Sequence, residues 1–106
     1  MHVVLSTIPP DAAAAFARKL VESRLAACVN VVSGVTSTYR WEGAVQHDSE
    51  SLLIIKTSSE TLPRLMSELP ALHPYDVPEI VVLDPTHVHG DYARWVNIEC
   101  NAVKPD

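Results

Sequence analysis

The chain has 106 residues, of which 47% are hydrophobic and 20% charged, with only three glycines. This is the size and composition of a globular chain with its own core, so we expect residues 1–106 to form a single domain. A formal net charge of −5, with no cluster of lysine or arginine, argues against nucleic acid and anionic membranes as partners.

The N-terminus and the two cysteines indicate the cellular compartment in which the protein is expected. Residues 1–6 lack the positive region of a signal peptide, and no apolar run approaches membrane-spanning length. Cys28 and Cys100 form neither a disulfide framework nor a zinc-binding spacing. We therefore expect a cytoplasmic protein.

Apolar periodicity predicts two strands and a helix in the first third of the chain. Residues 2–7 form a short apolar run typical of a buried strand. Asp11 follows two prolines and is expected to cap a helix through its carboxylate. That helix carries one apolar face, made of Ala13, Phe16, Ala17, Leu20 and Val21. Residues 26–32 are small and apolar, which predicts a second buried strand.

The second strand is expected to continue through a bend into a long hairpin. Gly34 interrupts the strand pattern, which indicates a bulge. Beyond it the side chains alternate, with Tyr39 and Trp41 on one side. Glu42-Gly43 is a turn signal, so the returning strand is predicted over residues 44–57. Its second half is apolar on both faces, as expected for a central strand.

Two helices and one strand are predicted in the second half. Leu62, Leu65, Met66 and Leu69 have helical spacing, and Pro70 is expected to end this helix or break its last turn. Residues 80–83 predict a fourth strand, and residues 91–97 a short last helix. The order β-α-β-β-α-β plus a helix is ferredoxin-like, an α+β fold with an antiparallel sheet and helices on one face.

The predicted hairpin is long for a chain of this size. Fourteen residues, 44–57, span ~45 Å at ~3.3 Å each. A compact chain of this length has a diameter of roughly 35 Å. The end that carries Tyr39 and Trp41 must project or bend. We favour self-association that covers these aromatic residues and the strand edge, with a hairpin curled over its own sheet as the alternative.

Three segments carry a resemblance to a known family. They are residues 24–30 (RLAACVN), residues 37–43 (STYRWEG) with 53–57 (LIIKT), and residues 73–80 (HPYDVPEI). In this order and spacing they resemble the divalent-cation tolerance protein family, CutA, and so do Gly90-Asp91-Tyr92 and Trp95. The resemblance runs from about Val3 to Trp95.

The resemblance implies a ferredoxin-like homotrimer whose hairpins engage neighbouring subunits, and a role in tolerance of copper or other divalent metal ions. No local nucleophile motif or glycine-rich phosphate loop is present, so we predict no enzymatic activity. The alternative function is a trimeric signalling or interaction scaffold that binds a small ligand or a partner protein without metal.

The segment 73–79 holds the candidate metal ligands. Pro74 and Pro78 hold the residues before them extended. His73, Asp76 and Glu79 offer imidazole nitrogen and carboxylate oxygen, a mixture that suits copper. The alternative is a rigid turn whose polar groups bond to the backbone, which we prefer for the two carboxylates.

The family comparison narrows this set to His73. In some members a thiol on the first strand and two consecutive histidines before this proline form a metal site. This chain has Ser6 and Leu72 at two of those three positions. Only His73 is carried over, so it is the one predicted metal ligand.

Other candidates have simpler interpretations. Cys28 is expected to be a buried small hydrophobe. His87 and His89 have no third ligand nearby in sequence, so turn or capping roles are preferred. Lys56 is expected to form an ion pair at an interface with a carboxylate such as Glu79 or Glu50. Packing and subunit contacts, rather than a pocket, are the preferred roles of Tyr39, Trp41, Tyr75 and Trp95.

Overall fold

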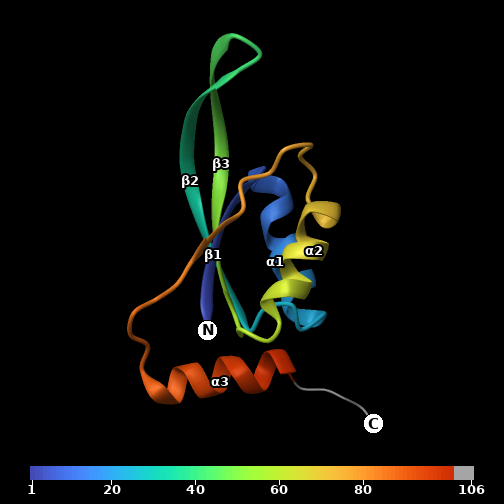
Figure 1. Cartoon of the computed structure of the whole chain (residues 1–106). Helices are drawn as coiled ribbons and strands as arrows, with labels where there is room; N and C mark the ends of the chain where they lie inside the picture. Colours follow the sequence, from blue (N-terminus) through green and yellow to red (C-terminus); the bar gives the residue numbers. More distant parts are fainter. Residues whose placement is uncertain (102–106) are drawn as a thin grey trace.

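The computed structural model describes residues 1–101 as an α+β fold with a four-stranded antiparallel sheet and three α-helices (Figure 1). The elements follow in the predicted order. They are β1 (His2–Ile8), a 3-10 turn η1 (Pro10–Ala12), α1 (Ala13–Glu22), β2 (Cys28–Trp41), β3 (Ala44–Thr57), α2 (Leu62–Leu72), β4 (Val81–Leu83) and α3 (Gly90–Asn101).

The sheet has the strand order β2-β3-β1-β4, with every neighbouring pair antiparallel. β1 lies between β3 and β4, and its seven residues all pair with β3. β4 is short and pairs only with Val3–Leu5, so the last part of β1 has no strand on that side. The predicted central position of the apolar half of β3 is confirmed.

One face of the sheet is covered by α1 and α2 (Figure 1). Alternate residues of β1 and β3 point into this core because side chains alternate across a strand. Each large aliphatic side chain buried there contributes about 1.5–3 kcal/mol. The core is made of Val4, Ile8, Phe16, Leu20, Leu25, Leu53, Ile55, Leu65 and Leu69 with small alanines.

The helix α3 lies across the end of the sheet where β1 begins (Figure 1). Val96 and Cys100, one helical turn apart, pack against Ala27. The Arg24 guanidinium donates to the Glu99 carbonyl at 2.7 Å and ties α3 to the end of α1. This continued apolar spacing carries the helix to Asn101, beyond the predicted residues 91–97.

The hairpin of β2 and β3 projects beyond the helices, as its length predicted (Figure 1). The longest dimension of the chain is 49 Å, against the roughly 35 Å of a compact chain. A register shift between Val32 and Val35 confirms the bulge at Gly34, whose φ is +77°. Glu42 and Gly43, at φ +50° and +82°, close the hairpin in the tight two-residue turn that matches strand twist.

Four local predictions were wrong. The strand predicted as buried over residues 26–32 is half-buried or exposed from Cys28 onward, because β2 lies at the edge of the sheet. Asp11 makes no side-chain cap, because the extended Pro9 starts the turn through its carbonyl, which accepts from the Ala12 N–H at 3.0 Å. Val21 is 40% exposed, at the edge of the apolar face of α1. Pro70 does not break α2, since in the last turn its missing N–H removes only one hydrogen bond and the His73 N–H still reaches the Leu69 carbonyl at 3.0 Å.

The opposite face of the sheet has no covering helix along most of its length (Figure 1). Strand register places the side chains of this open face. The apolar ones are Val3, Leu5, Val32, Leu52, Ile54, Val81 and Leu83. Among residues 1–101, no helix has the length and hydrophobicity needed to cross a membrane.

Candidate functional site

His73 lies at the end of α2 and is buried, with 7% of its surface exposed. Its Nε2 lies 2.9 Å from the Thr7 carbonyl, on the part of β1 that β4 leaves uncovered. Its Nδ1 accepts the Tyr75 N–H at 3.1 Å. The ring also packs edge-on against Phe16, with centroids 5.6 Å apart. His73 therefore joins α1, α2, β1 and the loop that follows α2.

These two partners determine the tautomer of His73. A carbonyl only accepts and a backbone N–H only donates, so the proton lies on Nε2 and the lone pair of Nδ1 is occupied. A metal ion would need one of these two nitrogens, so it would have to displace Thr7 or Tyr75. The structure shows a structural role for His73, and its role as a metal ligand stays a prediction.

The other predicted ligands do not converge on His73. Asp76 and Glu79 are exposed, and neither side chain has a partner in the part of the chain that the structure describes. Ser6 is fully buried on the helix-covered face, and its hydroxyl oxygen has no hydrogen-bond partner. Across residues 1–101, no three His, Cys, Asp or Glu side chains are grouped so that they could hold a metal ion.

Lys56 and Cys28 lie opposite each other on β3 and β2, on the open face. The Lys56 ammonium donates to Asn30 Oδ1 and lies 3.9 Å from the Cys28 sulfur. Lys56 forms no ion pair within residues 1–101, and Glu50 of the same chain lies six residues, about 20 Å, farther along β3. The ion pair expected at an interface stays a prediction. Cys28 is half-buried rather than buried.

The two histidines before α3 remain apart from any cluster of ligands. His87 is exposed, and His89 Nε2 lies 3.7 Å from a carboxylate oxygen of Asp91 in the first turn of the helix. That contact joins two side chains and is not a backbone cap, so the turn or capping role preferred for His89 stays a prediction.

Two tyrosine–carboxylate pairs lie where the hairpin leaves the sheet. The Tyr75 hydroxyl donates to the Glu50 carboxylate at 2.7 Å, and Glu50 is 7% exposed. The Tyr39 hydroxyl donates to Asp48. Burial, followed by the hydrogen bond to Glu50, raises the pKa of Tyr75 well above its usual value. The hydrogen bond to Asp48 is the main cause that raises the pKa of Tyr39.

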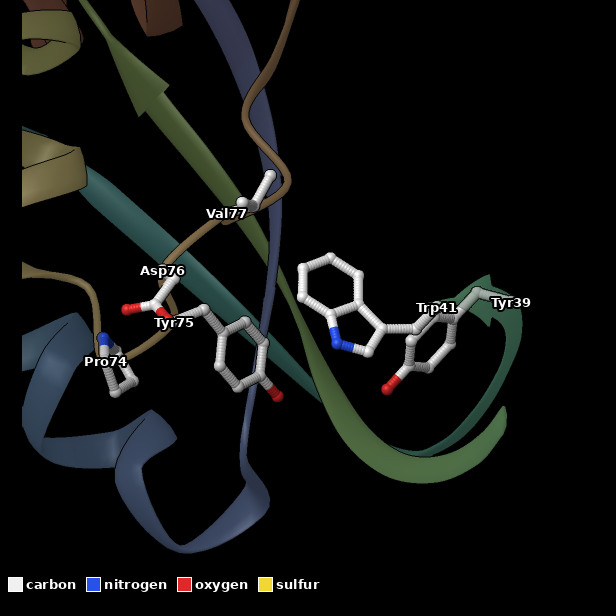
Figure 2. Close-up of a pocket in the computed structure, with 6 residues that line it drawn as sticks. All are labelled: Tyr39, Trp41, Pro74, Tyr75, Asp76 and Val77. Atoms are coloured by element: carbon white, nitrogen blue, oxygen red, sulfur yellow. The ribbon is translucent and has the colours of Figure 1, made fainter. Parts of the chain in front are cut away.

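A cavity of about 360 Å³ opens between the hairpin and the loop after α2. Figure 2 shows Trp41 and Tyr39 reaching from the hairpin toward Tyr75 and Val77 of the loop. Its lining is Tyr39, Trp41, Pro74, Tyr75, Asp76 and Val77. Three of the four aromatic residues for which packing and subunit contacts were preferred line this cavity, because the loop turns back toward the hairpin, and Trp95 lines a different one. Their role in subunit contacts stays a prediction.

The hydrogen bonds from the tyrosines to Asp48 and Glu50 were not predicted from the sequence, although the register of the hairpin indicates the first of them. A two-residue turn at Glu42-Gly43 pairs Tyr39 with Gln46, which makes Asp48 its diagonal neighbour. The Tyr75–Glu50 contact has no such local signal, since it joins residues 25 apart across the fold.

The comparisons with known proteins agree with this fold. Residues 2–99 match the family described as CutA1 divalent ion tolerance protein. The chain is 50% identical over 96 residues to the divalent-cation tolerance protein CutA of Thermus thermophilus, which covers 90% of this chain and 93% of that protein.

Solved structures give the same result. The PII-like protein CutA from Nostoc sp. PCC 7120 in apo form is similar with a TM-score of 0.90 and 35% identity, over 95% of this chain and 98% of that one. The periplasmic divalent cation tolerance protein CutA from Archaeoglobus fulgidus has a TM-score of 0.87 and 30% identity, over 95% and 100% of the two chains.

We predict that His73→Ala lowers the free energy of unfolding by about 2–4 kcal/mol, because it leaves the Thr7 carbonyl and the Tyr75 N–H without their partner and opens a void beside Phe16. The measurement is denaturant unfolding without metal. His87→Ala is the matched control at an exposed histidine and should change stability by less than about 0.5 kcal/mol. Equal stability of the two variants would contradict a structural role for His73.

We also predict that the three tyrosines of the folded protein ionise above their usual pKa of 10.0. The raised pKa means that the folded state keeps protons which the unfolded state releases. The stability from these groups is therefore complete below pH 10.0 and is lost as the pH rises above it. Tyrosinate absorbance, titrated in buffer and in concentrated guanidinium, tests this. Coincident titration curves would contradict the hydrogen-bonded pairs.

Proposed function

Since the chain belongs to the CutA1 divalent ion tolerance protein family, we propose that it contributes to divalent-cation tolerance as a cytoplasmic homotrimer without enzymatic activity. We further propose that it binds copper or other divalent metal ions where subunits meet near His73. The observation that carries this proposal is the family match over residues 2–99. The element order and the strand order support a ferredoxin-like architecture for each subunit.

Self-association is supported by the open face of the sheet. Seven apolar side chains from all four strands lie on it, and Val81 and Leu83 are each 45% exposed. A contiguous apolar surface of this kind is characteristic of an interface in a protein that stays in solution. Within residues 1–101 the outer edge of β2 also has no strand partner, so a neighbouring copy can pair with it.

The metal proposal depends on more than one copy. The residues of a single chain do not fit a divalent ion, because no group of three ligands exists within residues 1–101 and both nitrogens of His73 are hydrogen-bonded. Histidine and carboxylate ligands from adjoining copies would have to complete the site. The proposal is therefore one of weak binding that requires the assembly.

The cytoplasmic placement rests on the two cysteines. Cys28 and Cys100 are both free thiols in the structure, which suits a reducing compartment. The name of the Archaeoglobus relative places that protein in the periplasm, so fractionation of the native host is the direct test of this part of the proposal.

Metal binding is tested by calorimetric titration of copper(II) into metal-free protein purified without an affinity tag. We expect weak, saturable heats in the wild type and in His87→Ala, and their loss in His73→Ala. Light scattering on the same samples must show an unchanged assembly. Negligible heat in the wild type, or equal heats in all three proteins, would contradict the proposed site.

A charged substitution on the open face of the sheet tests the trimer. We predict a mass of about 35 kDa, three times the 11.6 kDa of one chain, for the wild type in solution. Val81→Glu should reduce the mass toward that of one chain, because a carboxylate cannot be buried there without a partner. Val21→Glu, at a similarly exposed valine on the edge of the apolar face of α1 and away from the open face of the sheet, should leave it unchanged. A wild type of one-chain mass would refute the assembly.

The alternative function, a trimeric scaffold that binds a small ligand without metal, has one observation in its favour. It is the cavity beneath Trp41, which has a size and an aromatic lining suited to a small molecule.

A further inference from the structure

The cavity between the hairpin and the loop after α2 is lined by three aromatic rings. Tyr39 and Trp41 come from β2 and Tyr75 from the loop, and Figure 2 shows Tyr75 on one side of the cavity and Trp41 with Tyr39 on the other. The ring contacts within residues 1–101 join Tyr75 to His73, but not to Trp41 or Tyr39. Tyr75 is therefore packed on its His73 side, while all three rings line the cavity and present a surface to it.

The charge around this gap has one sign. Asp76 lines the cavity, and Glu50 and Glu79 line an adjoining one of about 370 Å³ that shares Tyr39 and Tyr75. Asp48 lies behind Tyr39 as its hydrogen-bond acceptor. The six ion pairs found within residues 1–101 include none of these four carboxylates. Glu50 is also 7% exposed, so its charge is only partly screened by water.

Two of the three rings are held in place before any ligand arrives. Tyr75 is attached at both ends, through its backbone N–H to His73 and through its hydroxyl to Glu50. Its ring packs against His73 with centroids 4.9 Å apart. The Tyr39 hydroxyl is held by Asp48. Both phenols donate to carboxylates, and their raised pKa keeps them neutral. A preorganised pocket loses less entropy when it binds a ligand.

Rings and carboxylates together select one chemical class. Aromatic faces attract cations that are weakly hydrated and carry apolar groups, and Trp is the best of the three aromatic residues at this. A hydrated divalent ion instead needs oxygen or nitrogen ligands in its first shell, and the aromatic rings cannot supply them. An anion is excluded by the carboxylates, and a purely apolar ligand would leave their charge unused.

We propose that the cavity formed by Tyr39, Trp41 and Tyr75 is a binding site for a small alkylammonium compound. The cationic head lies between the three rings, and the carboxylates of Asp76 and Glu50 supply the opposing charge. His73 acts as a positioning residue, because it orients Tyr75 from behind and does not touch the ligand. The inference is independent of the metal proposal, since it requires neither a metal ion nor a free His73 nitrogen.

The test uses the full chain with a metal chelator present throughout, so that its result is separate from any failure of copper binding. Tetramethylammonium is the probe, and tert-butanol is the neutral control of similar shape. Transfer of NMR saturation from the protein to the probe methyl protons measures binding without a protein reporter. We expect saturable binding of tetramethylammonium in the millimolar range and none of tert-butanol.

Variants locate the site. Trp41→Leu and Tyr75→Leu should each weaken binding by about fivefold or more, the loss expected for one cation–π contact. Tyr75→Phe keeps the ring and should bind more tightly than Tyr75→Leu. Trp95→Leu is the matched control, because Trp95 is a similarly exposed tryptophan on α3 that lines a different cavity. Trp41 is 47% exposed, so its replacement does not threaten the core.

Three outcomes would overturn the proposal. The first is an absence of saturable tetramethylammonium binding in the wild type. The second is equal binding of tert-butanol, which would make the cavity an apolar site without selectivity for charge. The third is undiminished binding in both Trp41→Leu and Tyr75→Leu, which would place the cation elsewhere on the acidic surface. The mass of each variant in solution is measured in parallel, so that a change in assembly is not mistaken for a lost contact.

Discussion

The imidazole of His73 joins the parts of the fold that meet at the cavity. One ring nitrogen satisfies the Thr7 carbonyl at the end of β1, and the other holds the backbone of Tyr75. The end of β1, the end of α2 and Tyr75 in the lining of the cavity are thereby joined through one buried side chain. Because a buried backbone group left unpaired is costly, the loop after α2 has little freedom to move away from β1.

The sheet sets the second constraint, since it is apolar on both faces while α1 and α2 cover only one (Figure 1). A half-covered antiparallel sheet in water normally alternates apolar and polar residues along its strands. In β1 and β3, Leu5, Leu52 and Ile54 depart from that pattern on the open face. The same chain thus has a buried core under α1 and α2 and a second apolar surface that these helices do not cover.

The projecting hairpin contributes both to the sheet and to the cavity. Its length and its tight turn follow from local sequence, but its aromatic residues do not simply face solvent. Tyr39 and Trp41 lean toward the loop of their own chain (Figure 2) and remain 41% and 47% exposed. The expectation that a neighbouring copy covers them stays a prediction. The hairpin and the loop enclose a cavity lined by rings and bordered by carboxylates.

Local periodicity and turn chemistry were enough to predict the element order, the bulge at Gly34, the turn at Gly43 and the extent of β3, because these depend on neighbours in sequence. The family likewise followed from short segments with characteristic spacing. Only the tertiary structure decided the partners of His73, the Tyr75–Glu50 hydrogen bond and the cavity beneath Trp41. Each joins residues far apart in the chain, and their distances depend on how the loop after α2 packs against β1 and the hairpin.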